Sequence, residues 1–232
     1  MPRTCLLRKF RPVRARPILA AGLAACLLLS SGLPGAAHPH VWIEANLEIV
    51  RDANGQATEI RHVWRFDEIF SSSLLLDFDN NGNGKLDAEE LEEIGKVTRE
   101  SLGEYNFYTE VRSGSNIVDF YEPEPYIVDF DNGQLLMIMA LELTKPQPMG
   151  AEGFKVAVSD PTYYVAVELA DPTAVTVSGN GEKCTSKIVV PDWDALYARD
   201  ADRLADLFAA APGEKVEGSE DYLTWVEFHC PA

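Results

Sequence analysis

The chain has 232 residues, of which 46% are hydrophobic, so its composition fits one compact domain or two small ones rather than a disordered chain. It carries 37 acidic and 20 basic side chains, which give a formal net charge of −17. A surface of this sign has no basic patch for a phosphate backbone, and nucleic acid is therefore excluded as a partner.

The amino-terminal segment is typical of a cleavable secretory signal. Six basic side chains within residues 3–16 precede a short apolar run, Ile18 to Leu29. A membrane-spanning helix needs roughly twenty apolar residues, so this run is too short for one. Small residues follow it up to Ala37. We expect cleavage after Ala37, which makes residues 1–37 the signal peptide, His38 the mature amino terminus and the periplasm the destination.

A lipid anchor at Cys26 is the alternative, because residues 23–26 fit a lipobox. Removing residues 1–37 takes away six basic and no acidic groups, which leaves 14 basic and 37 acidic side chains and a charge of −23. The mature chain contains no apolar run long enough to be a transmembrane segment.

Two cysteines lie outside the signal, Cys184 and Cys230. An even number of cysteines in an oxidising compartment predicts a disulfide between them. This bridge would tie the last strand to the segment before the final helix and would be structural. A redox centre or a thiolate metal site is disfavoured, because the two residues lack the spacing of a CxxC motif.

The first mature segment predicts a β-hairpin with Asn54-Gly55 as a two-residue turn. The register that follows places Ile43, Ala45, Leu47 and Ile49 opposite Phe66, Trp64, His62 and Ile60. On the other face it sets Glu44 against Arg65 and Glu48 against Arg61, which are favourable cross-strand pairs. We expect His62 to be a core histidine.

A helix-loop-helix is predicted over about residues 67–103, with helices at 67–78 and 87–101 and Gly103 as the stop. The loop between the helices, residues 79–90, matches the twelve-residue EF-hand loop. Its expected calcium ligands are Asp79, Asn81, Asn83, the backbone carbonyl of Lys85, Asp87 and Glu90. Sensor EF-hands usually occur in pairs and no second loop is present, so a structural calcium clip is favoured over a switch. The alternative is a polar loop that binds no calcium.

The remainder of the chain reads as a series of antiparallel strands followed by one helix and a last strand. The expected strands are 107–111, 117–121, 126–130, 134–143, 154–158, 163–168, 175–178, 187–190 and 222–230. The apolar run 135–141 predicts a central strand covered on both faces. Asp192 caps a predicted amphipathic helix, whose Trp193, Leu196, Tyr197, Leu204, Leu207 and Phe208 share a face. The fold class is therefore α+β, one domain over residues 38–232 built on an antiparallel sheet or sandwich.

The new amino terminus, His38-Pro39-His40, is a candidate transition-metal site. The amine and ring of His38 can chelate one ion and His40 adds an imidazole, donors that suit nickel, cobalt, copper or zinc. Pro39 has no amide proton, which disfavours a square-planar peptide chelate. Glu227 and His229, on one face of the last strand, are possible further ligands. The alternative is an ordinary polar amino terminus.

Two short segments carry a resemblance to a known family. They are Ala37-His38-Pro39-His40-Val41-Trp42-Ile43 directly after the signal, and Asp160-Pro161-Thr162-Tyr163-Tyr164. With the hairpin they resemble the exported proteins of domain-of-unknown-function family 1007, over essentially the whole mature chain. The resemblance implies a periplasmic component of an uncharacterised transport system that accompanies nickel/cobalt-type permeases. It therefore implies metal-ion handling with an inner-membrane permease as partner.

Two function classes remain. The first is a periplasmic accessory protein that presents a transition metal on His38 and His40 to a permease, with calcium holding the neighbouring helices. The second is a calcium-stabilised envelope module whose ligand is a protein and whose histidines are incidental. An enzyme, such as a copper oxidase, is not expected, because no nucleophile and base, phosphate loop or catalytic metal motif stands out.

Overall fold

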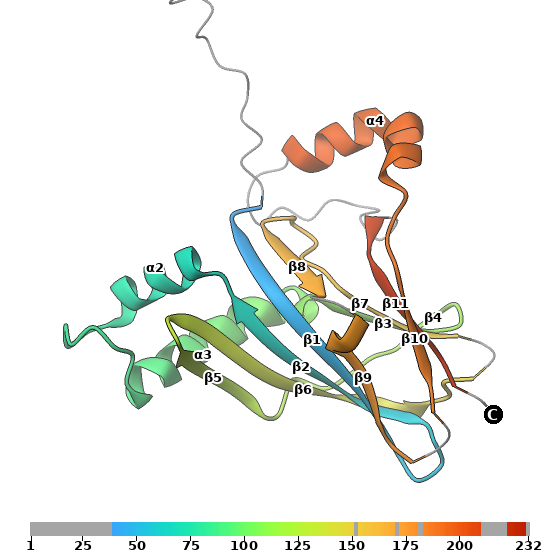
Figure 1. The fold of residues 1–232 in the computed structure, drawn as a ribbon, viewed down its shortest axis with the longest axis horizontal. Helices are drawn as coiled ribbons and strands as arrows, with labels where there is room; N and C mark the ends of the chain where they lie inside the picture. The colour runs from blue at the N-terminus through green and yellow to red at the C-terminus, as the bar shows by residue number, and fades with distance from the viewer. Residues whose placement is uncertain (1–38, 151–152, 170–171, 181–182, 210–221, 231–232) are drawn as a thin grey trace, which may run out of the picture. The chain divides into compact units, whose positions relative to one another are not determined.

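The computed structural model describes residues 39–150, 153–169, 172–180, 183–209 and 222–230. The predicted signal peptide, Cys26 and His38 lie outside these residues. Within them the fold is α+β, with two sheets and three α-helices (Figure 1). The six-stranded sheet contains β1 (Val41–Arg51), β2 (Ala57–Phe66), β5 (Tyr126–Asp131), β6 (Gln134–Gln147), β8 (Val165–Leu169) and β9 (Val175–Gly179).

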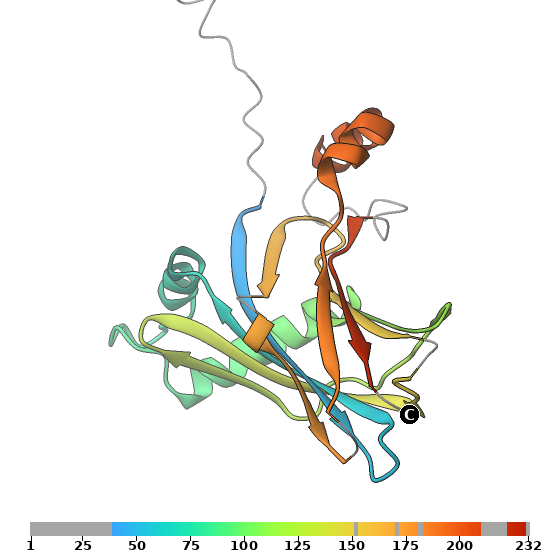
Figure 2. The ribbon, with the colours of Figure 1, turned by 45° about the vertical axis from the view of Figure 1, so that its right-hand side comes forward.

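The five-stranded sheet contains β3 (Thr109–Ser113), β4 (Asn116–Ile117), β7 (Phe154–Val158), β10 (Thr185–Val189) and β11 (Trp225–His229). The helices are α2 (Glu68–Phe78), α3 (Ala88–Gly103) and α4 (Trp193–Ala209), with 3-10 turns η1 (Asn106–Tyr108) and η2 (Pro172–Ala174). In both views α2 and α3 lie at the β5–β6 side of the larger sheet, and α4 lies at the end away from the β1–β2 turn (Figures 1 and 2).

The register of the first hairpin is confirmed. Ile43 pairs with Phe66, Ala45 with Trp64, Leu47 with His62 and Ile49 with Ile60, while Glu44 faces Arg65 and Glu48 faces Arg61. The apolar members of this ladder are buried in one core, together with side chains of the five-stranded sheet such as Phe154 and Phe228. Alternating burial along β1 thus fixes which face each side chain takes.

The turn of this hairpin differs from the predicted two-residue loop. The Asp52 amide donates to the Gln56 carbonyl at 2.9 Å, so three residues form the loop instead. The Asp52 carboxylate also accepts from the amides of Asn54 and Gln56, at 2.8 and 2.9 Å, and this stabilises the longer turn. A bulge at Thr58 then absorbs the extra residue, so the register beyond it is unchanged.

The five-stranded sheet is antiparallel, as predicted. The larger sheet is antiparallel from β1 through β2 and β6 to β5 but mixed as a whole, which corrects the expectation for β8 and β9. β1 pairs in parallel with β8 along its first half and with β9 along its second half. The turn η2 separates these two short strands. A period-two pattern reveals that a segment is a strand but carries no direction, so the sequence could not distinguish parallel from antiparallel pairing here.

Strand β6 lies between β5 and β2, as the apolar run 135–141 predicted for a central strand. Its two faces are not equally covered, however. Met137 and Met139 are fully buried, whereas Ile138 is 39% exposed and pairs with the exposed Val63 and Ile127. The expectation that both faces are covered is therefore wrong for Ile138.

Several predicted strands have other bounds in the structure: 107–111 is shifted to Thr109–Ser113, and 117–121, 163–168 and 222–230 are shortened to Asn116–Ile117, Val165–Leu169 and Trp225–His229. The segment 107–111 begins as the turn η1, in which Asn106, Phe107 and Tyr108 have positive φ angles of 53°, 48° and 51°. The segment 117–121 pairs only at β4 and through a single bridge between Phe120 and Leu143. Residues 106–108 have left-handed backbone angles, so the extended strand cannot begin before Thr109. A pattern of alternating apolar residues carries no information about such backbone angles.

Helix α4 packs against a small cluster of its own. Leu196 and Leu204 are buried with Tyr222, and Tyr163 and Trp193 pack against them. Tyr197 was expected on this face but is 51% exposed. The helix is interrupted further along, at Asp200 (φ −127°, ψ 32°), so its two halves do not follow one continuous 3.6-residue period. The predicted positions of Leu207 and Phe208 lie outside the side chains that the structure describes.

Candidate metal-binding sites

Residues 79–90 connect α2 to α3, and both helices have side-chain caps. Asp67 caps α2 by accepting hydrogen bonds from the amides of Ile69 and Phe70. Asp87 caps α3, and Glu90 completes a capping box by accepting from the Asp87 amide at 2.9 Å. The same two carboxylates occupy positions 9 and 12 of the predicted ligand set. The end of the predicted loop therefore overlaps the first turn of α3.

The first half of the loop is organised by backbone amides that donate to its side chains. Asp79 accepts from the amides of Asn83 and Gly84, at 3.0 and 2.7 Å. The Asn81 Oδ1 atom accepts from the Asn83 amide at 3.1 Å, and the Asn83 Oδ1 atom accepts from the Lys85 amide at 2.8 Å. Oxygens at positions 1, 3 and 5 are thereby fixed in orientation by the fold of the loop itself.

Three of the predicted ligand positions converge. The side-chain nitrogen of Asn81, Nδ2, donates to the Asp87 carboxylate at 2.9 Å and to the Glu90 carboxylate at 3.2 Å. Glu90 is only 5% exposed and also accepts from the Asn80 amide at 2.9 Å. The positive end of an amide dipole thus lies between two carboxylates, one of them buried, and such a place favours a cation.

The amino-terminal histidines are only partly described. His40 is exposed, its amide donates to the Tyr164 carbonyl at 2.9 Å, and its ring lies 4.8 Å from the Tyr164 ring. Glu227 and His229 lie on β11 opposite Lys187 and Thr185. In the described part of the chain, no three His, Cys, Asp or Glu side chains converge to hold a metal. An EF-hand loop also uses Asn and backbone oxygens, which that finding does not cover.

The segment Asp160–Tyr164 forms the turn whose Tyr164 contacts His40. Asp160 is 2% exposed, and its carboxylate accepts from the amides of Thr162 and Val165, at 2.8 and 2.9 Å. The Thr162 hydroxyl donates to the same carboxylate at 2.8 Å. Asp160 therefore holds the turn in shape, and Tyr164 meets the amino-terminal strand as a result. The described part of the amino-terminal segment, residues 39–43, and the segment 160–164 thus meet at His40 and Tyr164.

His62 is buried completely, as predicted. Its Nε2 atom lies 3.2 Å from the Thr109 hydroxyl, and its Nδ1 atom has no hydrogen-bond partner among the described residues. The Trp64 ring lies edge-on at 5.6 Å. Burial away from water lowers the pKa of His62 to about 3, because the charged imidazolium loses its hydration.

This burial predicts a loss of stability in mild acid. In the unfolded chain His62 becomes protonated near pH 6.5, whereas in the folded chain it stays neutral down to about pH 3. The free energy of unfolding is therefore unaffected by this group above pH 6.5 and falls as the pH decreases from 6.5 toward 3. We expect a loss of about 2 kcal/mol between pH 7 and pH 5 from this group. Urea unfolding of the protein and of His62→Leu at both pH values measures it, since other titrating groups cancel in the difference. Equal pH dependence in the two proteins would contradict the assignment.

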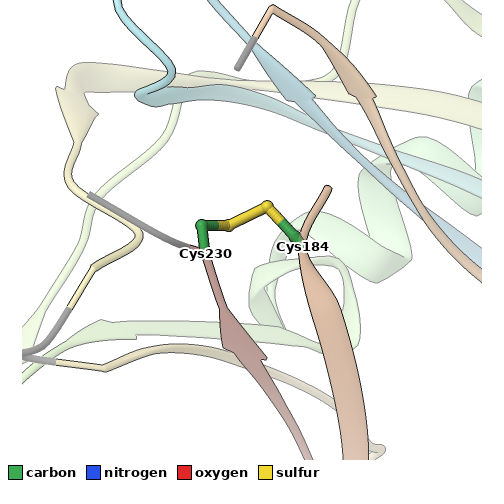
Figure 3. Close-up of a disulfide and its surroundings, with 2 residues drawn as sticks. All are labelled: Cys184 and Cys230. Atoms are coloured by element: carbon green, nitrogen blue, oxygen red, sulfur yellow. A yellow bond between two sulfur atoms is a disulfide. The ribbon is translucent and has the colours of Figure 1, made fainter. Parts of the chain in front are cut away.

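Cys184 and Cys230 form a disulfide, as the sequence predicted (Figure 3). The Cα atoms are 4.2 Å apart, and the two residues flank the paired strands β10 and β11, next to the Thr185–His229 pair. The bridge lies in a structural position, because it joins the ends of two strands that are already neighbours in the sheet.

The fold and these sites fit a class of small α+β proteins with a disulfide. The chain belongs to the family described as "Protein of unknown function (DUF1007)", which matches residues 23–230. An uncharacterized protein of Haemophilus influenzae is 28% identical over 182 residues, which cover 76% of this chain and 85% of that relative. An uncharacterized 15.5 kDa protein in the trpE 3′ region of Spirochaeta aurantia is 25% identical over 115 residues, which cover 47% and 79%.

Among solved structures, that of AChBP from Bulinus truncatus matches 91% of this chain and 98% of its own, at 11% identity and a TM-score of 0.38. No helix within the described ranges has the length and apolar character needed to cross a bilayer.

Sequence reasoning missed the role of Asp160. It treated residues 160–164 only as a family signature, whereas the carboxylate accepts bonds from three groups of its own turn. The signal was present, because Asp followed by Pro and Thr is typical of a turn closed by its own side chain.

Proposed function

We propose that this protein is an exported metal-binding protein in which loop 79–90 is an EF-hand that holds calcium between α2 and α3. The observation that carries the proposal is the convergence of Asn81, Asp87 and Glu90 around one point. Calcium prefers hard oxygen ligands in a flexible cage, and the loop supplies them from side chains and from the Lys85 carbonyl. Its role would be structural, because the ion would fix the first turn of α3 against the end of α2.

Calcium should raise the stability of the protein. If the dissociation constant is about 10⁻⁴ M, free calcium at about one hundred times that concentration stabilises the folded state by about 2.7 kcal/mol. Glu90→Gln should abolish most of this gain, because it removes the bidentate charge at position 12. Calorimetric titration and thermal unfolding, each with and without calcium, provide the measurement.

The matched control is Glu93→Gln, one turn further along α3 and exposed. It removes the same charge from the same helix but lies outside the loop. Glu90 also caps α3, so Glu90→Gln lowers stability without calcium as well; the decisive quantity is the increment that calcium adds. An equal increment in both variants would sink the proposal.

A second candidate function is the presentation of a transition metal to an inner-membrane permease. It is favoured by the contact of His40 with Tyr164, which holds the amino-terminal strand against the Asp160–Tyr164 turn. His38 and His40 would supply the nitrogen donors for nickel, cobalt, copper or zinc. Titration of the processed, metal-stripped protein in excess calcium should then show tight binding that His40→Ala weakens at least tenfold. Unchanged affinity in His40→Ala would leave only the calcium function.

A further inference from the structure

We infer that the groove between α3 and the edge strand β5 binds an extended, basic segment of a partner protein as an added strand. The groove has a volume of about 830 Å³. One ridge of α3 forms one side of it, and β5 forms the other. Its lining includes Glu89, Glu92, Gly95, Lys96, Arg99 and Val128.

Strand β5 offers open backbone groups along this groove. It is the last strand of its sheet, and among the described residues it pairs only with β6. The β5–β6 turn is a two-residue loop closed by Asp131 and Gln134, so the backbone groups that bond to β6 are those of residues 131, 129 and 127. Those of residues 126, 128 and 130 therefore point away from the sheet.

At the Phe130 end of this edge, the outward backbone amide already has a hydrogen-bond partner. The Phe130 amide donates to the Asp129 side chain at 2.8 Å, which both confirms its outward direction and closes that position. The open stretch is thus centred on Val128. Its six-residue strand contains neither Pro nor Lys, with which proteins commonly protect an exposed edge, and its two charged residues, Asp129 and Asp131, lie toward the end that is already occupied.

Helix α3 runs antiparallel to β5 at close range, which gives the groove a firm wall. The Tyr126 hydroxyl donates to Thr98 at 2.9 Å. A Cβ atom on Gly95 would be 3.5 Å from the nearest Val128 methyl group, so the helix nearly touches the strand there. An extended peptide beside a strand edge and along a helix is a common recognition mode, in which main-chain bonds give affinity and side-chain contacts give specificity.

Charge indicates the chemistry of the occupant. Three glutamates line the groove, Glu89, Glu92 and Glu93. Of the two basic residues, Arg99 already pairs with Glu122 and Glu124, at 3.6 and 3.5 Å. Lys96 is then the one lining cation outside these ion pairs, so the groove favours a segment with Lys or Arg side chains. A second copy of this chain fits poorly, because pairing β5 with itself brings the acidic rims of two molecules together.

The test uses a synthetic peptide of alternating valine and lysine, and a peptide of alternating proline and lysine with the same length and charge. The second peptide lacks an amide proton at every proline, so it cannot pair as a regular added strand, and its binding reports mainly electrostatic attraction to the acidic surface. We expect at least tenfold tighter binding of the first peptide in excess calcium. Hydrogen exchange of residues 126–131 should slow with the first peptide only.

Two variants of one position separate the strand edge from the surface charge. Val128→Pro removes the outward amide without touching a bond to β6, and it should lower affinity for the valine–lysine peptide at least tenfold. Val128→Thr keeps the amide and the branched shape, and it should bind within twofold of the parent. Circular dichroism and urea unfolding verify that both variants fold.

Equal binding of the two peptides, or equal binding by the two variants, would overturn the inference. So would a dimer that Val128→Pro dissociates, because a second copy would then occupy the edge. The inference does not depend on calcium binding, whose own test is the Glu90→Gln increment.

Discussion

Replacing both Cys184 and Cys230 by serine should lower the free energy of unfolding by about 4 kcal/mol. The bridge closes a segment of 46 residues in the unfolded chain, and a cross-link of that span removes conformational entropy that the open chain regains. In the folded protein the strands remain paired beside it, so little native structure depends on the bond itself. Urea unfolding at equilibrium measures the change.

Reduction of the unmutated protein supplies the control for this prediction. It opens the same bond without changing a residue, so the reduced protein and the double serine variant should unfold at similar urea concentrations. A loss below about 1 kcal/mol in both would contradict the prediction, and would indicate that the unfolded chain is already restricted by other means.

Gly179→Ala should destabilise the protein by about 2 to 5 kcal/mol, from overpacking and an unfavourable backbone angle together. Gly179 ends β9 opposite Arg51 of β1 and has a φ of +93°. A Cβ atom there would lie 2.2 Å from the Arg51 carbonyl oxygen, a distance at which the two strands must separate. We expect early urea unfolding and faster hydrogen exchange of the β9 amides.

Gly150→Ala is the matched comparison, because its added Cβ meets no atom of the described residues within 4 Å and its φ is not left-handed. It should change stability by less than about 0.5 kcal/mol. If Gly179→Ala were as stable as Gly150→Ala, the close approach of β9 to β1 would not exist in solution.

Much of the local structure could be predicted from sequence because each signal is short in range. The hairpin register follows from alternation and from the Glu44–Arg65 and Glu48–Arg61 pairs, and the structure reproduces it. The loop length was wrong, because the Asp52 carboxylate stabilises a longer turn whose extra residue the bulge at Thr58 then absorbs. A pattern of apolar residues does not show hydrogen bonds between a side chain and the backbone of its own turn.

Features that join distant segments were less predictable. The predicted ligand positions of loop 79–90 all lie within twelve residues, so naming them requires no knowledge of the fold. The contact of His40 with Tyr164, and the groove between α3 and β5, depend instead on how separate elements pack. The pairing of Cys184 with Cys230 was an exception, since only two cysteines remained to be paired.

The parallel pairing of β1 determines the order in which this sheet can be completed as the chain is made. Val41 pairs with Val165, a partner that is synthesised 124 positions later. An exported chain emerges amino end first, so β1 precedes this partner by the interval in which those 124 positions emerge. During it β1 can pair with β2 but leaves one long edge of unpaired backbone groups open to other chains. A chain that ends before residue 165 should therefore aggregate, and a binding protein that shields nascent strands should associate with this one early.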